Sequence, residues 1–348
     1  MSVIKRVLKY LLAVLIIASI VMGVWVVIPI SVDRASPDPA VVYANARNGE
    51  AESYQENYFE FAGQTLHYVE AGQGETVVFL HGFPSFWYSL IRQMDDLKLD
   101  HHVVAIDGLG AGRSDAPGEV ALYKLEAMTR HLLALIDHLG KQRVHLVGHD
   151  WGSGLAFAFA QQYPERVLSV TGIAAAPQSV MLELIRTDAR HQEISAYVER
   201  FKGANPPLLF TLRVGQRIYD GAYGPLVEAG KLSAEEGELF RNATSDPKRM
   251  NAFINWYRAN IPAPDEIDDD DFFPTRKAQI TPPALFIWGS EDPIVTREAV
   301  AQITAASSNL QTLEIEGLGH WPHVHEHARV TAKIRRLIES NSAQRLRP

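Results

Sequence analysis

The residues of this chain best suited to chemistry lie in the segment 148–152, which reads Gly-His-Asp-Trp-Gly. Its central residue is Asp150, and the glycines on either side permit a backbone turn too tight for side chains. An aspartate has an ordinary pKa of about 3.9, so it is ionised at neutral pH and can attack a saturated carbon directly, forming an alkyl ester. The segment therefore predicts an aspartate nucleophile. The simpler interpretation is a helix N-cap on a structural turn.

The sequence around Asp150 supplies the elements that would hold it in place. Residues 144–147 form a short apolar run typical of a buried strand, and residues 151–162 have a helical pattern. A strand, a tight turn and a helix in this order place Asp150 at the end of the strand. The same order places it at the helix N-terminus, where the helix dipole favours an anion.

The rest of the body alternates strands and helices. Two alternating segments, 58–61 and 66–69, flank Gly63 and predict an antiparallel hairpin. Other strands are predicted at 76–80, 102–106, 144–147, 167–173, 284–288 and 310–315, and helices at 125–139, 151–162 and 325–339. This alternation predicts an α/β fold, with a mostly parallel sheet and helices on both of its faces.

One connection is too long for a simple crossover. About 100 residues separate the strand at 167–173 from the strand at 284–288, far more than compact domains use. The stretch has helical signals of its own at 181–201 and 233–241. It predicts an inserted helical cap over the carboxyl edge of the sheet, where open α/β sheets bind ligands.

Two further motifs follow predicted strands. Residues 81–84 read His-Gly-Phe-Pro, and residues 107–115 read Asp-Gly-Leu-Gly-Ala-Gly-Arg-Ser-Asp. With the Asp150 segment, and in this order, they resemble the α/β-hydrolase family, specifically its epoxide hydrolase and haloalkane dehalogenase branch, over about residues 58–337. The resemblance implies the α/β-hydrolase fold, without cofactor or metal. It also implies an oxyanion hole made by the backbone N–H groups of Phe83 and Trp151, and a structural role for the second motif.

The resemblance also implies an acid and a base. Residues 288–293 read Trp-Gly-Ser-Glu-Asp-Pro and residues 317–321 read Gly-Leu-Gly-His-Trp. His320 is then the base that activates water to attack the ester, and Asp292 orients it. Glu291 is the neighbouring alternative for the acid. The family often has Gln three residues after the histidine, where this chain has His323.

Two tyrosines of the predicted cap bear on the leaving group. Tyr197 and Tyr257 lie in segments that resemble those from which epoxide hydrolases present a tyrosine pair. Epoxide opening develops an alkoxide that stays on the substrate, and a protonated tyrosine can donate to it. We therefore predict hydrolysis of a small hydrophobic epoxide to a vicinal diol. The alternative interpretation of each tyrosine is a packing residue of the cap.

A haloalkane or haloacetate dehalogenase with the same aspartate nucleophile is the alternative function. Many haloalkane dehalogenases have Asn where this chain has Phe83, and haloacetate dehalogenases carry arginines where it has Trp151 and Gly154. Trp151 could bind a halide, but epoxide hydrolases share that tryptophan. A non-catalytic ligand-binding protein of the same fold is a third interpretation. It is disfavoured because Asp150, Asp292 and His320 are all present.

The N-terminus predicts a membrane anchor. Residues 11–30 are 20 residues without a charge, and at about 1.5 Å per residue they span a hydrocarbon core of roughly 30 Å. Lys5, Arg6 and Lys9 precede them, which predicts a single-pass membrane protein with a cytoplasmic N-terminus and an extracytoplasmic catalytic domain. A cleaved signal peptide is the alternative.

The chain then divides into six predicted parts. These are 1–30 as cytoplasmic stub and transmembrane anchor, 31–52 as linker, 53–177 as the first part of the hydrolase core, 178–278 as the helical cap, 279–342 as the second part of the core, and 343–348 as the tail. The acid-rich segment 265–271 is predicted to be a solvated hinge where the cap returns to the core.

Composition excludes several classes of function. The net charge of −8 implies no basic face, which argues against nucleic-acid binding. The chain has no cysteine, so disulfides and thiolate chemistry are excluded. Histidines 320, 323, 325 and 327 cluster in the sequence, but we predict no metal site because zinc needs three or four converging ligands. The oligomeric state stays open.

Overall fold

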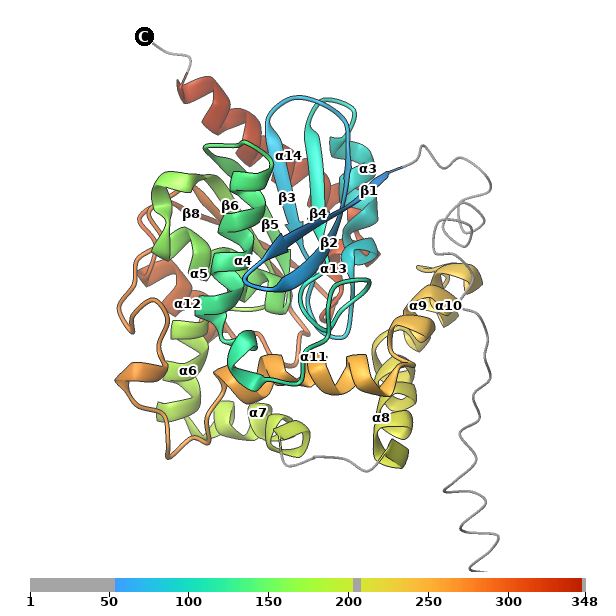
Figure 1. The fold of residues 1–348 in the computed structure, drawn as a ribbon. Helices are drawn as coiled ribbons and strands as arrows, with labels where there is room; N and C mark the ends of the chain where they lie inside the picture. Colours follow the sequence, from blue (N-terminus) through green and yellow to red (C-terminus); the bar gives the residue numbers. More distant parts are fainter. Residues whose placement is uncertain (1–53, 203–207, 346–348) are drawn as a thin grey trace, which may run out of the picture. The chain divides into compact units, whose positions relative to one another are not determined.

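The computed structural model describes residues 54–202 and 208–345 (Figure 1). The predicted anchor and linker lie outside these residues. Within them, no helix combines the length and the apolar character that a membrane crossing requires.

A single mixed sheet forms the centre of the described fold. Its eight strands are β1 (Gln55–Phe61), β2 (Gln64–Ala71), β3 (Thr76–Leu80), β4 (His102–Ile106), β5 (Val144–His149), β6 (Val167–Ile173), β7 (Ala284–Gly289) and β8 (Leu310–Ile315). They lie in the order β1-β2-β4-β3-β5-β6-β7-β8. The hairpin β1–β2 and the pair β2–β4 are antiparallel, and all other pairs are parallel. The predicted fold class and hairpin are confirmed.

The central strands are apolar because both faces of the sheet are covered. Every residue of β3, β5, β6 and β7 is buried, whereas the outermost strand β8 is mostly half-buried. A parallel strand buried on both faces needs a continuous apolar run rather than an alternating one. Leu80 pairs with both Ile106 and Gly148, so β3, β4 and β5 end at the same edge. The loops that follow them therefore start side by side.

Six helices of the described chain accompany the core strands. They are α3 (Ile91–Leu97), α4 (Leu125–His138), α5 (Trp151–Gln162), α12 (Arg297–Ala305), α13 (Pro322–His325) and α14 (His327–Arg345). The predicted last helix at 325–339 is wrong at its start. Pro322 begins a separate short helix, and Glu326 breaks the helical path with φ −123° and ψ 44°.

The long connection between β6 and β7 holds six helices and no strand in its described part. They are α6 (Gln178–Thr187), α7 (Ala189–Lys202), α8 (Leu208–Ala222), α9 (Gly224–Glu228), α10 (Ala234–Ala243) and α11 (Pro247–Asn260). Figure 1 shows α6, α7, α8 and α11 together at one end of the sheet. The single helix predicted at 181–201 is instead two, because Asp188 takes extended backbone angles and caps α7 through the N–H of Arg190. The exact cap boundaries stay a prediction.

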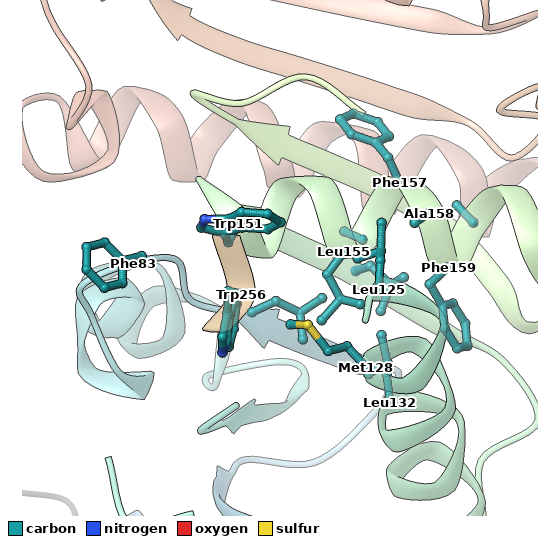
Figure 2. Packing of buried hydrophobic residues seen from close by; sticks show 14 of the residues in the cluster. Phe83, Leu125, Met128, Leu132, Trp151, Leu155, Phe157, Ala158, Phe159 and Trp256 are labelled. Atoms are coloured by element: carbon teal, nitrogen blue, oxygen red, sulfur yellow. The ribbon is translucent and has the colours of Figure 1, made fainter. Parts of the chain in front are cut away.

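The helix after Asp150 is buried on all sides. Residues 151–160 of α5 are all buried, between the sheet and α4. Figure 2 shows the side chains that join the two helices: Leu155 and Phe159 on α5, and Leu125, Met128 and Leu132 on α4. This close packing fixes the N-terminal turn of α5, which carries Asp150.

Candidate active site

Asp150 lies on a strained turn between β5 and α5. Its φ is 53° and its ψ −123°, a combination that costs a residue with a side chain on the order of 1–3 kcal/mol. The turn is tight because a Cβ at Gly148 would lie 2.0 Å from the carbonyl oxygen of Gly152. A Cβ at Gly152 would lie equally close to the carbonyl oxygen of Leu80. Both glycines are therefore required for steric reasons.

The Asp150 carboxylate is held as an anion. Its Oδ1 accepts the backbone N–H of Phe83 at 2.7 Å, and its Oδ2 lies 3.4 Å from Nε2 of His320. Burial by itself raises the pKa of Asp150. The contact with His320, the positive charge of His320 and the backbone N–H of Trp151 outweigh burial and hold that pKa below its usual value. Oδ1 accepts the N–H of Phe83, so Oδ2 is the oxygen left to react.

His320 bridges two carboxylates. Its Nδ1 lies 2.9 Å from Oδ2 of Asp292, and its Nε2 faces Asp150. Burial lowers the pKa of His320, but the hydrogen bonds to Asp150 and Asp292 raise it to about 10. Asp292 is buried and also accepts the N–H of Ile294, whereas Glu291 is exposed. The structure thus brings Asp150, His320 and Asp292 together and leaves Glu291 outside.

Tyr197 and Tyr257 extend from two helices of the β6–β7 connection toward Asp150. Tyr197 on α7 and Tyr257 on α11 have ring centroids 6.1 Å apart, and both line one cavity with Asp150. Burial and the negative charge of Asp150 raise the pKa of both phenols, so both stay protonated at neutral pH. The Trp151 ring packs edge-on against the Tyr257 ring.

A small cavity of about 50 Å³ joins these groups. Asp150, Trp151 and both tyrosines line it, and most of the remaining wall is apolar or glycine. Gln178 also lines it, but its side chain is engaged, with its amide N–H on the Asn260 carbonyl and its oxygen on the N–H of Phe273. The cavity therefore presents one anion and two phenols in apolar surroundings.

Comparison with known proteins gives the family of this chain. Residues 75–326 match the family model described as alpha/beta hydrolase fold. The chain belongs to the α/β-hydrolase family. It is 30% identical to Epoxide hydrolase 4 of Mus musculus over 75% of this chain and 72% of that protein. It is 31% identical to Epoxide hydrolase 3 of Xenopus tropicalis over 70% of this chain and 65% of that protein, just under two thirds of that relative's length.

Solved structures extend the comparison. An epoxide hydrolase of Bacillus megaterium in complex with an inhibitor superposes with a TM-score of 0.73, at 25% sequence identity, over 81% of this chain and all of the other. The predicted family is confirmed: this α/β-hydrolase is an enzyme of the epoxide hydrolase branch.

The motif at residues 107–115 has a structural role, because its Asp107 fixes the loop and the segments around it. The buried carboxylate of Asp107 lies 2.7 Å from Nδ1 of His67 and accepts the backbone N–H groups of Trp87 and Arg113. No oxygen of Asp107 is left to face the cavity. In the described chain, no three potential ligands come together as a metal site.

Sequence reasoning missed one residue beside the reacting groups. The buried ring of His149 contacts the rings of Trp321 and His323 and the backbone of His320. Its position directly before Asp150 was visible in the sequence, but its contact with a loop 171 residues away was not.

Proposed function

We propose that this α/β-hydrolase opens epoxides to vicinal diols through an ester on Asp150. The observation that carries the proposal is the shared cavity, where an ionised carboxylate faces two protonated phenols. A carboxylate can attack a ring carbon while a phenol gives its proton to the departing oxygen. The relatives named above are epoxide hydrolases, which supports this substrate class.

In the first step Oδ2 of Asp150 forms a bond to a ring carbon and the carbon–oxygen bond of the epoxide breaks. The ring oxygen takes a proton from Tyr197 or Tyr257 and becomes a hydroxyl on the bound substrate. The other phenol, whose ring centroid lies 6.1 Å away, stabilises the resulting phenolate. The phenolate regains its proton from solvent.

Ester formation converts His320 into a base. The negative charge of Asp150 supports the high pKa of His320, and the ester carries no such charge. His320 then releases its proton to solvent and can accept one from water, while Asp292 holds its other nitrogen at 2.9 Å. The attacking water gives one proton to His320 and its remaining hydroxyl to the Asp150 carbonyl carbon. The N–H groups of Phe83 and Trp151 hold the oxyanion, and collapse releases the diol, which takes the proton from His320. The Asp150 carboxylic acid that remains gives its proton to His320, which restores the ion pair.

The two phenols favour an epoxide over a halide. A departing epoxide oxygen needs a proton, which Tyr197 and Tyr257 can donate in the cavity that Asp150 lines. A dehalogenase needs N–H donors for the departing halide. The Trp151 indole packs edge-on against the Tyr257 ring, and the Trp256 indole donates to the backbone oxygen of Leu109 at 2.8 Å. Dehalogenation is therefore the second candidate.

Turnover on a small panel tests the reaction type. The full-length enzyme would be assayed with styrene oxide, a fatty-acid epoxide, a 1-haloalkane and fluoroacetate, with Asp150→Asn as the blank. We expect diol formation that the blank abolishes, without halide release. Halide release without diol would replace the proposal by dehalogenation.

The ester intermediate gives a direct test of His320. In His320→Gln the first step proceeds and the second has no base, so styrene oxide adds its mass of about 120 Da to the protein, on Asp150. Intact-mass and peptide analysis would detect it. Steady turnover by this variant, without an adduct, would remove His320 from the proposed role.

We further propose that residues 1–30 tether the enzyme to a membrane, with the N-terminus in the cytoplasm and the catalytic domain on the other side. The support is the uncharged segment 11–30 and the basic residues before it. We expect the full chain to remain in a carbonate-washed membrane pellet and a variant lacking residues 1–30 to leave it. Recovery of the full chain in the supernatant would contradict the membrane tether. Protection from added protease would show on which side of the membrane the catalytic domain lies.

A further inference from the structure

The residue before the nucleophile contacts the backbone of the base. His149 is the last residue of β5, and Asp150 follows it directly. Its buried ring places Nε2 2.9 Å from the backbone carbonyl oxygen of His320. A carbonyl oxygen only accepts hydrogen bonds, so Nε2 carries the proton and donates it. The end of β5 therefore leads into the proposed nucleophile, Asp150, and through His149 also hydrogen-bonds to the proposed base, His320.

The loop that carries His320 is tied to the core on two sides. From the end of β7, the N–H of Glu291 donates to the carbonyl of Leu318 at 2.9 Å, and Ser290 accepts the N–H of Gly317. From the end of β5, the His149 ring holds the carbonyl of His320. The hydrogen bond from His149 sets the position of His320 relative to Asp150. The two hydrogen bonds to the end of β7 do not, because they contact neither residue.

The surroundings of the His149 ring are aromatic and poor in hydrogen bonds. Its centroid lies 4.8 Å from that of Trp321 and 4.1 Å from that of His323, which follow His320 at the end of the loop and in α13. His323 is completely buried, and neither of its ring nitrogens has a hydrogen bond of ordinary geometry to the described chain, although the backbone of Ser89 lies beside the ring. An imidazole in such a place destabilises the fold relative to a ring without nitrogens.

Both buried rings are neutral at working pH. Burial lowers the pKa of His149, and His320 and His323 lower it further against the opposing charge of Asp150. Burial also lowers the pKa of His323, to about 3, with His320, Arg92 and His325 as the positive groups around it. His149 thus acts as a neutral donor, and only His320 among the three contacting rings carries a charge.

We propose that His149 is a positioning residue for His320. Its Nε2–H holds the backbone of the base so that the imidazole spans Asp292 and Asp150, while His323 only packs against the His149 ring. The inference rests on the proposed function, because its kinetic test follows the ester on Asp150.

The two buried histidines give a matched pair of variants. His149→Phe and His323→Phe each replace a buried imidazole with a ring of similar size, but only the first removes the hydrogen bond to His320. In single-turnover reactions with styrene oxide, we expect His149→Phe to slow ester hydrolysis about 10- to 100-fold and to change ester formation less than 3-fold, since small displacements of a catalytic group have effects of this size. The ester would then accumulate at steady state.

Two further variants separate positioning from packing. His149→Gln offers an amide N–H at a similar reach and should restore hydrolysis to within about 5-fold. In His323→Phe, the rate constants of ester formation and of ester hydrolysis should stay within about 3-fold of the wild-type values. Its melting temperature should rise, because the substitution removes two unpartnered nitrogens. Equal losses in the two Phe variants, or unchanged hydrolysis in His149→Phe, would overturn the proposal.

A measurement without substrate keeps this test independent of the proposed reaction. In imidazole-nitrogen NMR of the full-length enzyme, His149 should appear as the neutral Nε2–H tautomer, and the proton between His320 and Asp292 should give a strongly downfield signal. We expect that signal to shift or vanish in His149→Phe and to persist in His149→Gln and His323→Phe. If no ester forms in any protein, the proposed function fails; an unchanged signal in His149→Phe would reject the positioning role by itself.

Discussion

At the scale of single residues, Asp150 and His320 form an ion pair before any substrate binds. The carboxylate has a lowered pKa and the imidazole a pKa raised to about 10, and each shift depends on the partner. Because the two pKa values depend on each other, this pair of side chains has one protonation state in the free enzyme and another in the ester. The free enzyme holds a carboxylate beside an imidazolium, which suits attack on carbon, and alkylation of Asp150 removes the charge that kept His320 protonated.

The ion pair predicts a pH dependence of stability. Because the folded-state pKa of His320 is raised from its ordinary value of 6.5 to about 10, its protonated form stabilises the fold fully below about pH 6.5 and progressively less as the pH rises through 10. Melting temperatures measured from pH 6 to 10.5 should fall for the wild-type protein, relative to a flatter curve for His320→Gln. Parallel curves for the two proteins would contradict the ion pair.

The tyrosine pair predicts a graded loss of ester formation. Tyr197→Phe or Tyr257→Phe should each slow single-turnover ester formation about 10- to 100-fold, since one phenol remains, and the double variant should lose about 10³-fold or more. The His320-dependent hydrolysis of a preformed ester should change much less. Equal effects on both steps would favour the packing interpretation of these residues.

At the scale of elements, the first turn of α5 carries the nucleophile and also forms a wall of the cavity. Gly154 lines that cavity and its N–H donates to the carbonyl of Asp150. A Cβ built on Gly154 would meet only the carbonyl oxygen of Ala176, at 3.9 Å, so a side chain there would extend into the cavity. This position therefore offers control of substrate size without disturbing the turn.

We expect Gly154→Val to select against bulky substrates. Its kcat/KM for styrene oxide should fall at least about 10-fold relative to its kcat/KM for propylene oxide, because a pocket wall discriminates by about 1–3 kcal/mol. Gly154→Ala, which adds a single methyl group, is the matched control and should change the ratio less than 3-fold. Equal losses for both epoxides in Gly154→Val would mean that the turn itself was disturbed.

At the scale of the whole described fold, polar contacts join the cap to the core. Glu236 of α10 is nearly buried, caps its own helix through Ser233, and accepts hydrogen bonds from Tyr88 and Arg92 of the core. Arg92 also donates to the backbone of Lys231. These contacts tie the N-terminal end of α10 to α3, and so tie one part of the cap to the core that carries Asp150.

The contact between Arg92 and Glu236 predicts that substitutions of two arginines change the free energy of unfolding by different amounts. Arg92→Met should lower the free energy of unfolding by about 1–3 kcal/mol, because Glu236 keeps its burial and loses its positive partner. Arg130→Met is the control, since the Arg130–Glu126 pair is more than half exposed and such pairs contribute about 0–1 kcal/mol. Urea unfolding measures both. Equal midpoints would show that the cap contact contributes little.

The amino-acid sequence alone was enough to predict the strands, the tight turn at Asp150 and the family. These features depend on neighbours in the chain: apolar runs of strand length, glycines where a Cβ would collide, and motifs that follow strand ends in a fixed order. The helix predicted at 181–201 was wrong because helical periodicity continues across Asp188, where an extended backbone and a new cap end one helix and start another.

Which side chains contact one another became known only from the three-dimensional structure. It buries Asp292 against His320 and leaves the adjacent Glu291 exposed, a choice that depends on how the loop after β7 packs against the loop after β8. It also brings Tyr197 and Tyr257 from separate helices to one cavity, and His149 to the backbone of His320. Contacts between residues far apart in the chain depend on packing and register, which local sequence patterns do not encode.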